Sequence, residues 1–289
     1  MANSIALFQK YVDKLDEVYS MASLTSDLDT NNAVVKYDEK TKTFQIPKMS
    51  LDGLADYDRN GGYVDGGVTL TYESKAPDYD RGRAFNVDAM DDDETAGVAF
   101  GQLSATFIKT KSTPELDAYR FAQYAAKAGL TTTGANLTNG ADAIAAIAAA
   151  FDEMTNNEVD VEGRILYITP VINGYIRDMD TTKSREVMGL FSKVLVVPQS
   201  RFYTAIDLKD GTTSGEESGH YAKATGAKNI NFMIIEPSAI MQNVKHRVNK
   251  VITPAENQSA DAYKFFFRAY GIADVLDNKA KGVYLHKAA

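Results

Sequence analysis

Cysteine and tryptophan are both absent from this chain, and histidine occurs only three times in 289 residues. Without cysteine the chain can form no disulfide, no thiolate zinc site and no cysteine nucleophile. Long apolar runs are lacking too: no stretch of about 18 apolar residues occurs, so we expect no membrane-spanning helix. The first twenty residues contain neither a basic leader nor a long apolar core, so we expect no signal peptide.

A surplus of positive charge is also lacking, because 39 acidic residues outweigh 31 basic ones and the net charge is −8. Proteins that depend on phosphate contacts usually carry a basic surplus. We therefore expect any DNA to be contacted only weakly. One basic run, Lys245, His246, Arg247 and Lys250, falls on a predicted strand. It could touch DNA or an acidic neighbour, and a solvated strand face is the simpler interpretation.

The N-terminal segment has the pattern of an amphipathic helix. Apolar residues recur three and four positions apart between Ser4 and Tyr19, and the polar residues from Ser20 to Asn32 follow. This pattern predicts an arm on a polar tether. A helix packed on its own domain fits equally well.

Weak strand signals follow over residues 43–47, 68–73 and 83–89, with the Gly- and Asp-rich stretch 52–67 between the first two. The sequence offers little to bury in a core of its own. An extended hairpin that reaches a neighbouring molecule would explain it, and so would a loose surface insertion.

The second half predicts an α+β fold, because short apolar strands alternate with helices at irregular spacing. A face marked by Ala96, Ala99, Phe100, Leu103 and Phe107 predicts one helix. The next has Thr113 as N-cap, Pro114 at its first position and Gly129 as terminator, with a stripe of small and aromatic residues at positions 118, 121, 122, 125 and 128. Another helix covers 144–151. The predicted strands are 165–169, 193–199, 231–236, 263–276 and 281–286.

No constellation of side chains reaches the level of a catalytic, cofactor-binding or metal site. The acids Asp88 and Asp91 to Glu94 lack the spacing of a calcium loop and indicate a solvated helix start. Ser214, Ser218 and His220 lie in a polar run without a nucleophile elbow. We therefore expect no enzyme and no cofactor. An unrecognised hydrolase remains an alternative, which a cleft with His220 beside a serine or an acid would favour.

Four segments, taken in order, resemble the major capsid proteins of tailed bacteriophages, whose fold is shared with encapsulins. They are YDRGRAFNVDAMDDDET (79–95), TPELDAYRFAQYA (113–125), GRILYITPVINGYIRD (163–178) and FFFRAYGIADVLDNKAKGVYLHK (265–287). The resemblance implies that fold: an N-terminal arm (1–34), an extended β-hairpin loop region (35–92), a peripheral domain with a long spine helix (93–134 and 240–259), and an axial domain (135–239 and 260–289).

The resemblance further implies self-assembly into hexamers and pentamers of an icosahedral head around double-stranded DNA. The expected partners are other copies of the chain, a separate scaffolding protein, a portal and decoration proteins, with assembly in the host cytoplasm and location in the virion. An encapsulin-like compartment is the alternative. Some members of this fold cross-link through an extended-loop lysine; Lys75 lies in that segment and Lys48 near it, but no partner set is identifiable. The candidate intersubunit contacts are Phe8, Tyr11 and Leu15 in the arm, Tyr63, Tyr72 and Lys75 in the hairpin, Tyr79, Arg81 and Arg83 after it, and Glu115 and Arg120 in the spine helix.

Overall fold

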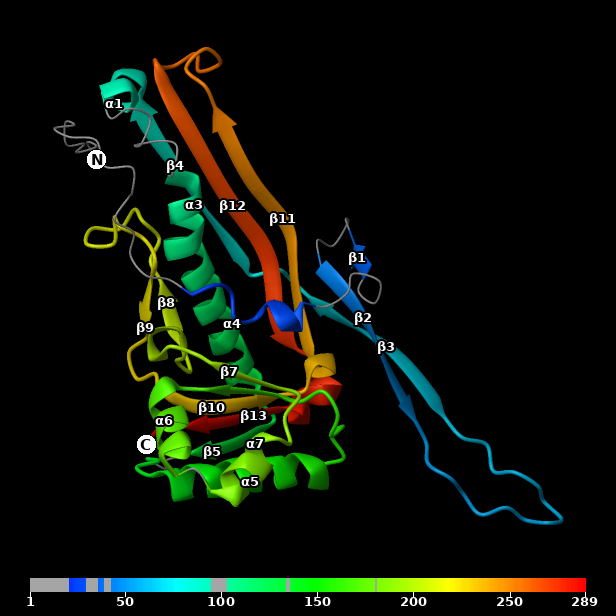
Figure 1. Cartoon of the computed structure of the whole chain (residues 1–289). Helices are drawn as coiled ribbons and strands as arrows, with labels where there is room; N and C mark the ends of the chain where they lie inside the picture. The colour runs from blue at the N-terminus through cyan, green and yellow to red at the C-terminus, as the bar shows by residue number, and fades with distance from the viewer. Residues whose placement is uncertain (1–20, 30–35, 39–42, 95–102, 134–135, 180) are drawn as a thin grey trace.

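The computed structural model describes residues 21–29, 36–38, 43–94, 103–133, 136–179 and 181–289. They form an elongated body from which one β-hairpin extends away (Figure 1). The candidate contacts Phe8, Tyr11 and Leu15, and most of the expected helix over 96–107, lie outside the described residues.

A five-stranded mixed sheet forms one end of the body. Its strand order is β5 (Leu130–Thr133), β13 (Val283–Lys287), β10 (Ile230–Ile235), β6 (Ile165–Ile168) and β7 (Lys193–Val196). Alternate side chains face opposite layers. Those such as Leu166 and Phe232 pack against α5 (Gly140–Asn156), α6 (Pro170–Met179) and α7 (Thr182–Met188). Those such as Tyr167 and Met233 pack in a second apolar cluster with the helix α4 (Thr113–Lys127).

A three-stranded antiparallel sheet forms the other end, in the order β11 (Ile240–Ile252), β12 (Ala262–Val275), β4 (Tyr79–Asp88). We call this the peripheral sheet and the five-stranded sheet the axial sheet. Residues 262–275 and 79–88 are strands of the peripheral sheet, whereas the expected domain ranges place them in the axial domain and in the hairpin region. The sequence did not show that β12 belongs to the peripheral sheet, because its apolar run is continuous. The first half of this run packs on the spine helix, and its last residues lie near the axial sheet.

The spine helix differs from its expected start. Helix α3 (Leu103–Phe107) runs into a π-helical turn, η2 (Ile108–Ser112), and then directly into α4. Thr113 is therefore not an N-cap: it lies inside the continuous helix, and both its N–H and its hydroxyl donate to the carbonyl of Ile108. Pro114 has no N–H to donate, and the wider turn before it accommodates that loss.

The expected stripe on this helix is confirmed in its main part, because Ala118 and Phe121 are fully buried and Ala122 and Ala125 nearly so. The helix ends at Lys127. A Cβ on Gly129 would lie 2.5 Å from the carbonyl carbon of Ala280, so glycine is needed here for close backbone approach.

The remaining elements are small. A two-stranded ribbon of β8 (Ile206–Leu208) and β9 (Tyr221–Lys223) lies beside α4, and α1 (Ala89–Glu94) follows β4 at the far end of the peripheral sheet (Figure 1). Short 3₁₀ turns are η1 (Ser26–Leu28), η3 (Gln199–Arg201), η4 (Pro237–Ala239) and η5 (Asp277–Gly282). None of the helices in the described part of the chain is long and apolar enough to cross a membrane.

Candidate intersubunit surfaces

The extended hairpin has one apolar face and one polar face. It consists of β2 (Thr43–Leu51) and β3 (Val68–Lys75), with β1 (Lys36–Asp38) at its base. Opposed residues of an antiparallel pair share a face. The pairs Pro47–Tyr72, Met49–Leu70 and Leu51–Val68 form the apolar face, and Lys48–Thr71 and Ser50–Thr69 form the polar face.

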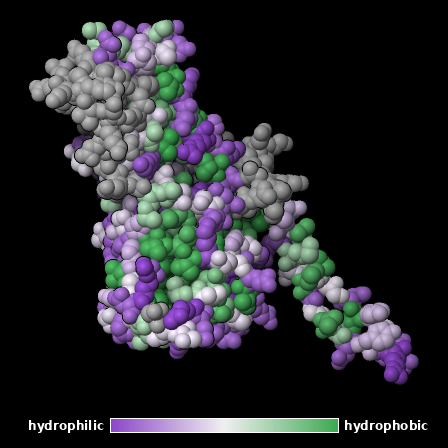
Figure 2. Space-filling model, viewed as in Figure 1, coloured by the Kyte–Doolittle hydropathy of each residue, from purple (hydrophilic) through white to green (hydrophobic). Residues whose placement is uncertain are grey.

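The apolar face of the hairpin is uncovered in the isolated subunit. Met49, Leu51, Val68, Leu70 and Tyr72 are 50 to 66 % exposed, and apolar atoms are visible along the projecting hairpin (Figure 2). A two-stranded ribbon is at best marginally stable in water unless something packs on it. This surface therefore has the composition of a core face, and none of the described residues of its own chain buries it.

The loop at the hairpin's tip is ordered by two aspartates. Asp52 accepts a hydrogen bond from the Gly67 N–H at 2.7 Å, and Asp58 accepts from the N–H groups of Asn60 and Gly61, both at 3.0 Å. Gly62 has a φ of +82°, which favours glycine. The candidate residue Tyr63 lies at this tip and is 89 % exposed.

The hairpin is anchored at its base by a cluster of charges around Lys75. Its ammonium contacts the carboxylates of Glu73, Asp274 (3.0 Å) and Asp277 (3.2 Å), and its side chain is only 12 % exposed. Burial by itself lowers the pKa of Lys75, but the three carboxylates outweigh it and the pKa is raised. The protonated amine is thus paired with carboxylates of β3, β12 and η5, so Lys75 anchors the base of the hairpin to the body.

An apolar cluster completes the anchor. Phe44 is 4 % exposed and packs with the buried Met241 and Ile272, with Ile46 and Leu276 at the rim. The direction of the hairpin is thus fixed by one aromatic side chain and one ion cluster.

Three other candidates hold the subunit itself together. Glu115 is 7 % exposed; it lies 2.7 Å from Arg81 Nε, accepts from the hydroxyl of the buried Tyr79, and has His220 Nδ1 at 3.5 Å. Burial raises the pKa of Glu115, but the interactions with His220 and Arg81 outweigh it, and the pKa is lowered. Tyr79, Arg81 and Glu115 are therefore committed to contacts within one chain.

His220 lies beside an acid, an arrangement that would favour the hydrolase alternative if it lay in a cleft, but the same carboxylate forms an ion pair with Arg81. The Arg81 guanidinium already donates a hydrogen bond to the Glu115 carboxylate. Ser214 and Ser218 are exposed, and neither is hydrogen-bonded to the imidazole. His220 also has a φ of +73°, in the left-handed region. No group of three or more metal-ligating side chains occurs within the described ranges.

The remaining two arginines also face their own chain. Arg83 donates to the carbonyl of Glu217 at 2.9 Å. Arg120 is 4 % exposed and donates to the Thr25 hydroxyl at 2.8 Å. Of the candidates in the described residues, Tyr63 and Tyr72 remain the exposed ones.

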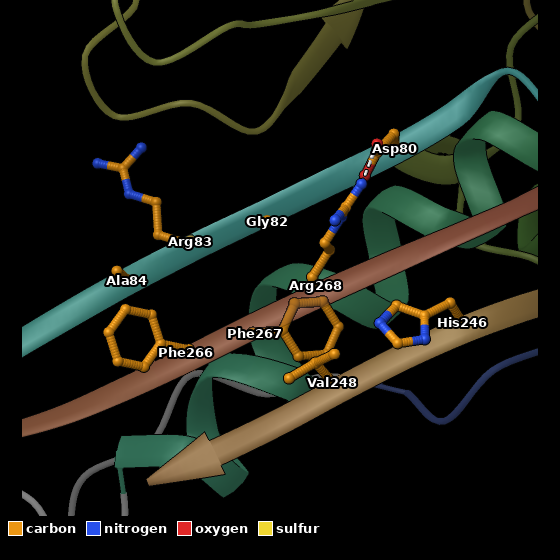
Figure 3. Close-up of a pocket in the computed structure, with 9 residues that line it drawn as sticks. All are labelled: Asp80, Gly82, Arg83, Ala84, His246, Val248, Phe266, Phe267 and Arg268. Atoms are coloured by element: carbon orange, nitrogen blue, oxygen red, sulfur yellow. Dashed lines mark hydrogen bonds and ion pairs between the residues drawn. The ribbon is translucent and has the colours of Figure 1, made fainter. Parts of the chain in front are cut away.

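A shallow groove on the peripheral sheet was missed from the sequence. Gly82 and Ala84 on β4 leave space beside Phe266 on β12 and Val248 on β11, with His246 at one end (Figure 3). The groove has a volume of about 590 Å³. The Arg268 guanidinium and Asp80 carboxylate, 2.6 and 2.8 Å apart, form its rim. Ala84 is the direct cross-strand partner of Phe266, and Gly82 is that of Arg268; the sequence alone gave no sign of this pairing.

The basic run on β11 does not form a single face. His246 and Lys250 pair with Tyr270 and Phe266 of β12, whereas Arg247 lies on the other side with its guanidinium 5.8 Å from the Phe267 ring centre. The interpretation as a basic strip for DNA is therefore weakened.

Comparison with known proteins rests on structure alone, since no family model and no curated protein matches the chain by sequence. A structure from Mycobacterium phage Che8 superposes with a TM-score of 0.66 at 15% identity, covering 99% of this chain and 98% of that one. The mature capsid of bacteriophage PhiM1 gives 0.68 at 11% identity, covering 98% and 92%. A virus-like particle from Pyrococcus furiosus gives 0.52 at 10% identity, covering 82% and 86%.

The two phage matches cover 98 to 99% of this chain. They confirm the expected fold class. The chain has the α+β fold of phage major capsid proteins.

Proposed function

We propose that this chain is a structural subunit that self-assembles into hexamers and pentamers of an icosahedral phage head enclosing double-stranded DNA. The observation that carries the proposal is the uncovered apolar face of the hairpin, which extends away from its own body. Burial of an apolar face against another protein surface is favourable, and a second copy of the chain can provide that surface. The full-length fold likeness to phage capsid structures supports the same conclusion.

The assembly logic is that of heterologous contacts, in which one surface of a copy meets a different surface of the next. Such contacts close into rings when the rotation permits. An extended hairpin buries more area between copies than compact bodies could. The N-terminal arm can likewise bury area on a neighbouring copy. The subunit then needs no catalytic centre, no cofactor and no membrane, and its location is the virion after assembly in the host cytoplasm.

The groove lined by Phe266 and Val248 is a candidate acceptor for the hairpin loop of a second copy. Loop 52–67 contains four aspartates and one arginine, and it exposes Tyr57 and Tyr63. The paired side chains of Arg268 and Asp80 give the groove a polar rim, and its apolar floor suits an aromatic ring.

The test is to replace residues 52–67 by the dipeptide Asn-Gly. Leu51 and Val68 are direct cross-strand partners, so a two-residue turn can close the shortened ribbon. We expect the variant to fold with an unchanged melting temperature and to lose most assembly, as followed by light scattering and negative-stain microscopy. Assembly of the variant at the wild-type level would show that the loop makes no contact between copies, and a wild-type chain that forms no particles would contradict the proposal. A variant that keeps the loop but carries Arg59→Ala at its exposed tip is the control.

The contents of the particles distinguish a phage head from the encapsulin-like compartment. The acidic balance suits a lining that lets packed DNA slide. With a scaffolding protein and a portal present, we expect heads that contain DNA. Particles that enclose a folded cargo protein would favour the compartment. The phage matches cover 98 to 99% of the chain and the archaeal particle 82%, which supports the head.

A further inference from the structure

A buried polar site holds the segment 21–29, which the sequence suggested was a polar tether. At its centre is Asp117 of the spine helix, which is 0 % exposed. Its carboxylate accepts from the Ser23 hydroxyl at 2.9 Å, the Leu24 N–H at 3.0 Å and the Thr25 hydroxyl at 2.8 Å. The fourth donor, at 3.1 Å, is Arg201.

The other side chains of the site come from three separate elements. Arg201 of η3 also donates to the Met21 carbonyl at 3.1 Å, and the Arg120 guanidinium on α4 donates to the Thr25 hydroxyl. Gln242 of β11 is fully buried and donates to the Thr25 carbonyl at 2.8 Å. The site therefore joins the spine helix, the axial body and the peripheral sheet around one short peptide.

The segment is seated in this site as a ligand is. Thr25 is 0 % exposed and Leu28 is 2 % exposed, within the apolar cluster that includes Phe121. The sequence pattern indicated a polar tether at positions 23 and 25. In the structure, their hydroxyls donate hydrogen bonds to the buried Asp117 carboxylate. Ser26, between them and Leu28, is exposed.

We propose that residues 21–29 act as an internal peptide ligand, with Asp117 as the positioning residue, and that their seating fixes the point on the subunit from which the N-terminal arm begins. The destination of the arm on a neighbouring copy rests on the proposed function. The seat itself is a property of the single subunit and can be measured there.

The seat holds because leaving it exposes unmet polar groups. Three of the four donors to Asp117 belong to the segment, and a buried carboxylate that loses them is strongly disfavoured. With Met21 seated, the predicted arm helix over residues 4–19 is tethered at a fixed point on the subunit. If the seat opened, the chain back to Lys36 would add about 50 Å. A longer tether lowers the effective concentration of the arm at its neighbour, and it lets the arm reach a wider range of positions.

The test compares two substitutions at one buried position by hydrogen exchange of unassembled, full-length subunits. Thr25→Val removes the hydroxyl that joins Asp117 and Arg120, and we expect exchange of the Leu24 amide to accelerate about 10- to 100-fold. Thr25→Ser keeps the hydroxyl, and exchange should stay within a few-fold of the wild type. Asp117→Asn should act as Thr25→Val does, and Ser26→Ala should have no effect. Amides of β10 report on global stability and should not change with Thr25→Val.

A Leu24 amide that is unprotected in the wild type, or equally protected in Thr25→Val and Thr25→Ser, would overturn the seat. Equal acceleration of the β10 amides would show that the segment is merely part of the fold and positions nothing. In assembly reactions, Thr25→Val should still form particles, with a broader range of diameters than Thr25→Ser. Equally uniform particles would overturn the positioning role. Absence of particles from the wild type would instead count against the shell function and leave the exchange result to decide the seat.

Discussion

The apolar face of the hairpin should contribute to association and not to folding. Replacing Met49 and Leu70 by threonine, which also favours strands, removes one cross-strand pair from the centre of that face. Full burial of such a side chain contributes about 1.5–3 kcal/mol. Because Met49 is 56 % and Leu70 50 % exposed in the subunit, roughly half of this gain, or about 1 kcal/mol each, remains for a neighbour to supply. The double variant should therefore associate about 30-fold more weakly.

Two measurements separate the effects. The critical concentration for assembly, followed by light scattering, should rise about 30-fold, while the melting temperature of the isolated subunit should stay nearly constant. Ser50→Ala with Thr71→Ala alters the polar face of the same strands and is the matched control. An unchanged critical concentration would refute the assignment of this face to a neighbour. A fall in melting temperature matching the assembly defect would mean that the face supports the subunit's own fold.

Three further predictions concern the body. Gly129→Ala should lower stability by about 1–3 kcal/mol through overlap with Ala280, whereas Gly53→Ala, with open space around it, should be nearly neutral; urea unfolding of both checks this. Lys75→Met should destabilise the hairpin base by about 2 kcal/mol at pH 7, because the raised pKa keeps this contribution intact below about 10.5, the ordinary value, and it is lost only as the pH rises through the folded pKa; an unchanged urea midpoint would contradict it. The pKa of Glu115 is lowered, so its contribution is complete above its ordinary value of 4.5 and disappears as the pH falls through the folded pKa; Glu115→Gln should flatten the stability profile between pH 5 and pH 3.

The sequence predicted the local elements well where the pattern was local. The alternation of Val68, Leu70 and Tyr72 correctly indicated a strand, and the stripe of Ala118 and Phe121 correctly indicated the buried face of the spine. The start of that helix was wrong, since Thr113 and Pro114 look like a terminus and give no sign that the chain upstream is already helical.

Long-range partners could not be predicted in the same way. Glu115 and Arg120, which were expected as intersubunit contacts on the spine helix, are buried within the subunit. Their burial depends on Arg81 and Thr25, which are distant in sequence. The same limit applies to Ser23 and Thr25, whose polarity indicated a linker. Only the folded chain brings Asp117 to them.

The π-helical turn at Ile108–Ser112 gives the spine two different faces along its length. Upstream, Phe107 packs against Phe85, Phe265 and Phe267 at ring separations of 4.9 to 6.2 Å; downstream, Phe121 packs against Tyr167 of the axial sheet. An extra residue in one turn rotates everything before it by about 100° about the helix axis. The turn therefore lets one helix direct aromatic side chains toward two sheets that lie at different orientations. Deleting one residue there would leave a regular helix whose first aromatic ring points away from its three partners.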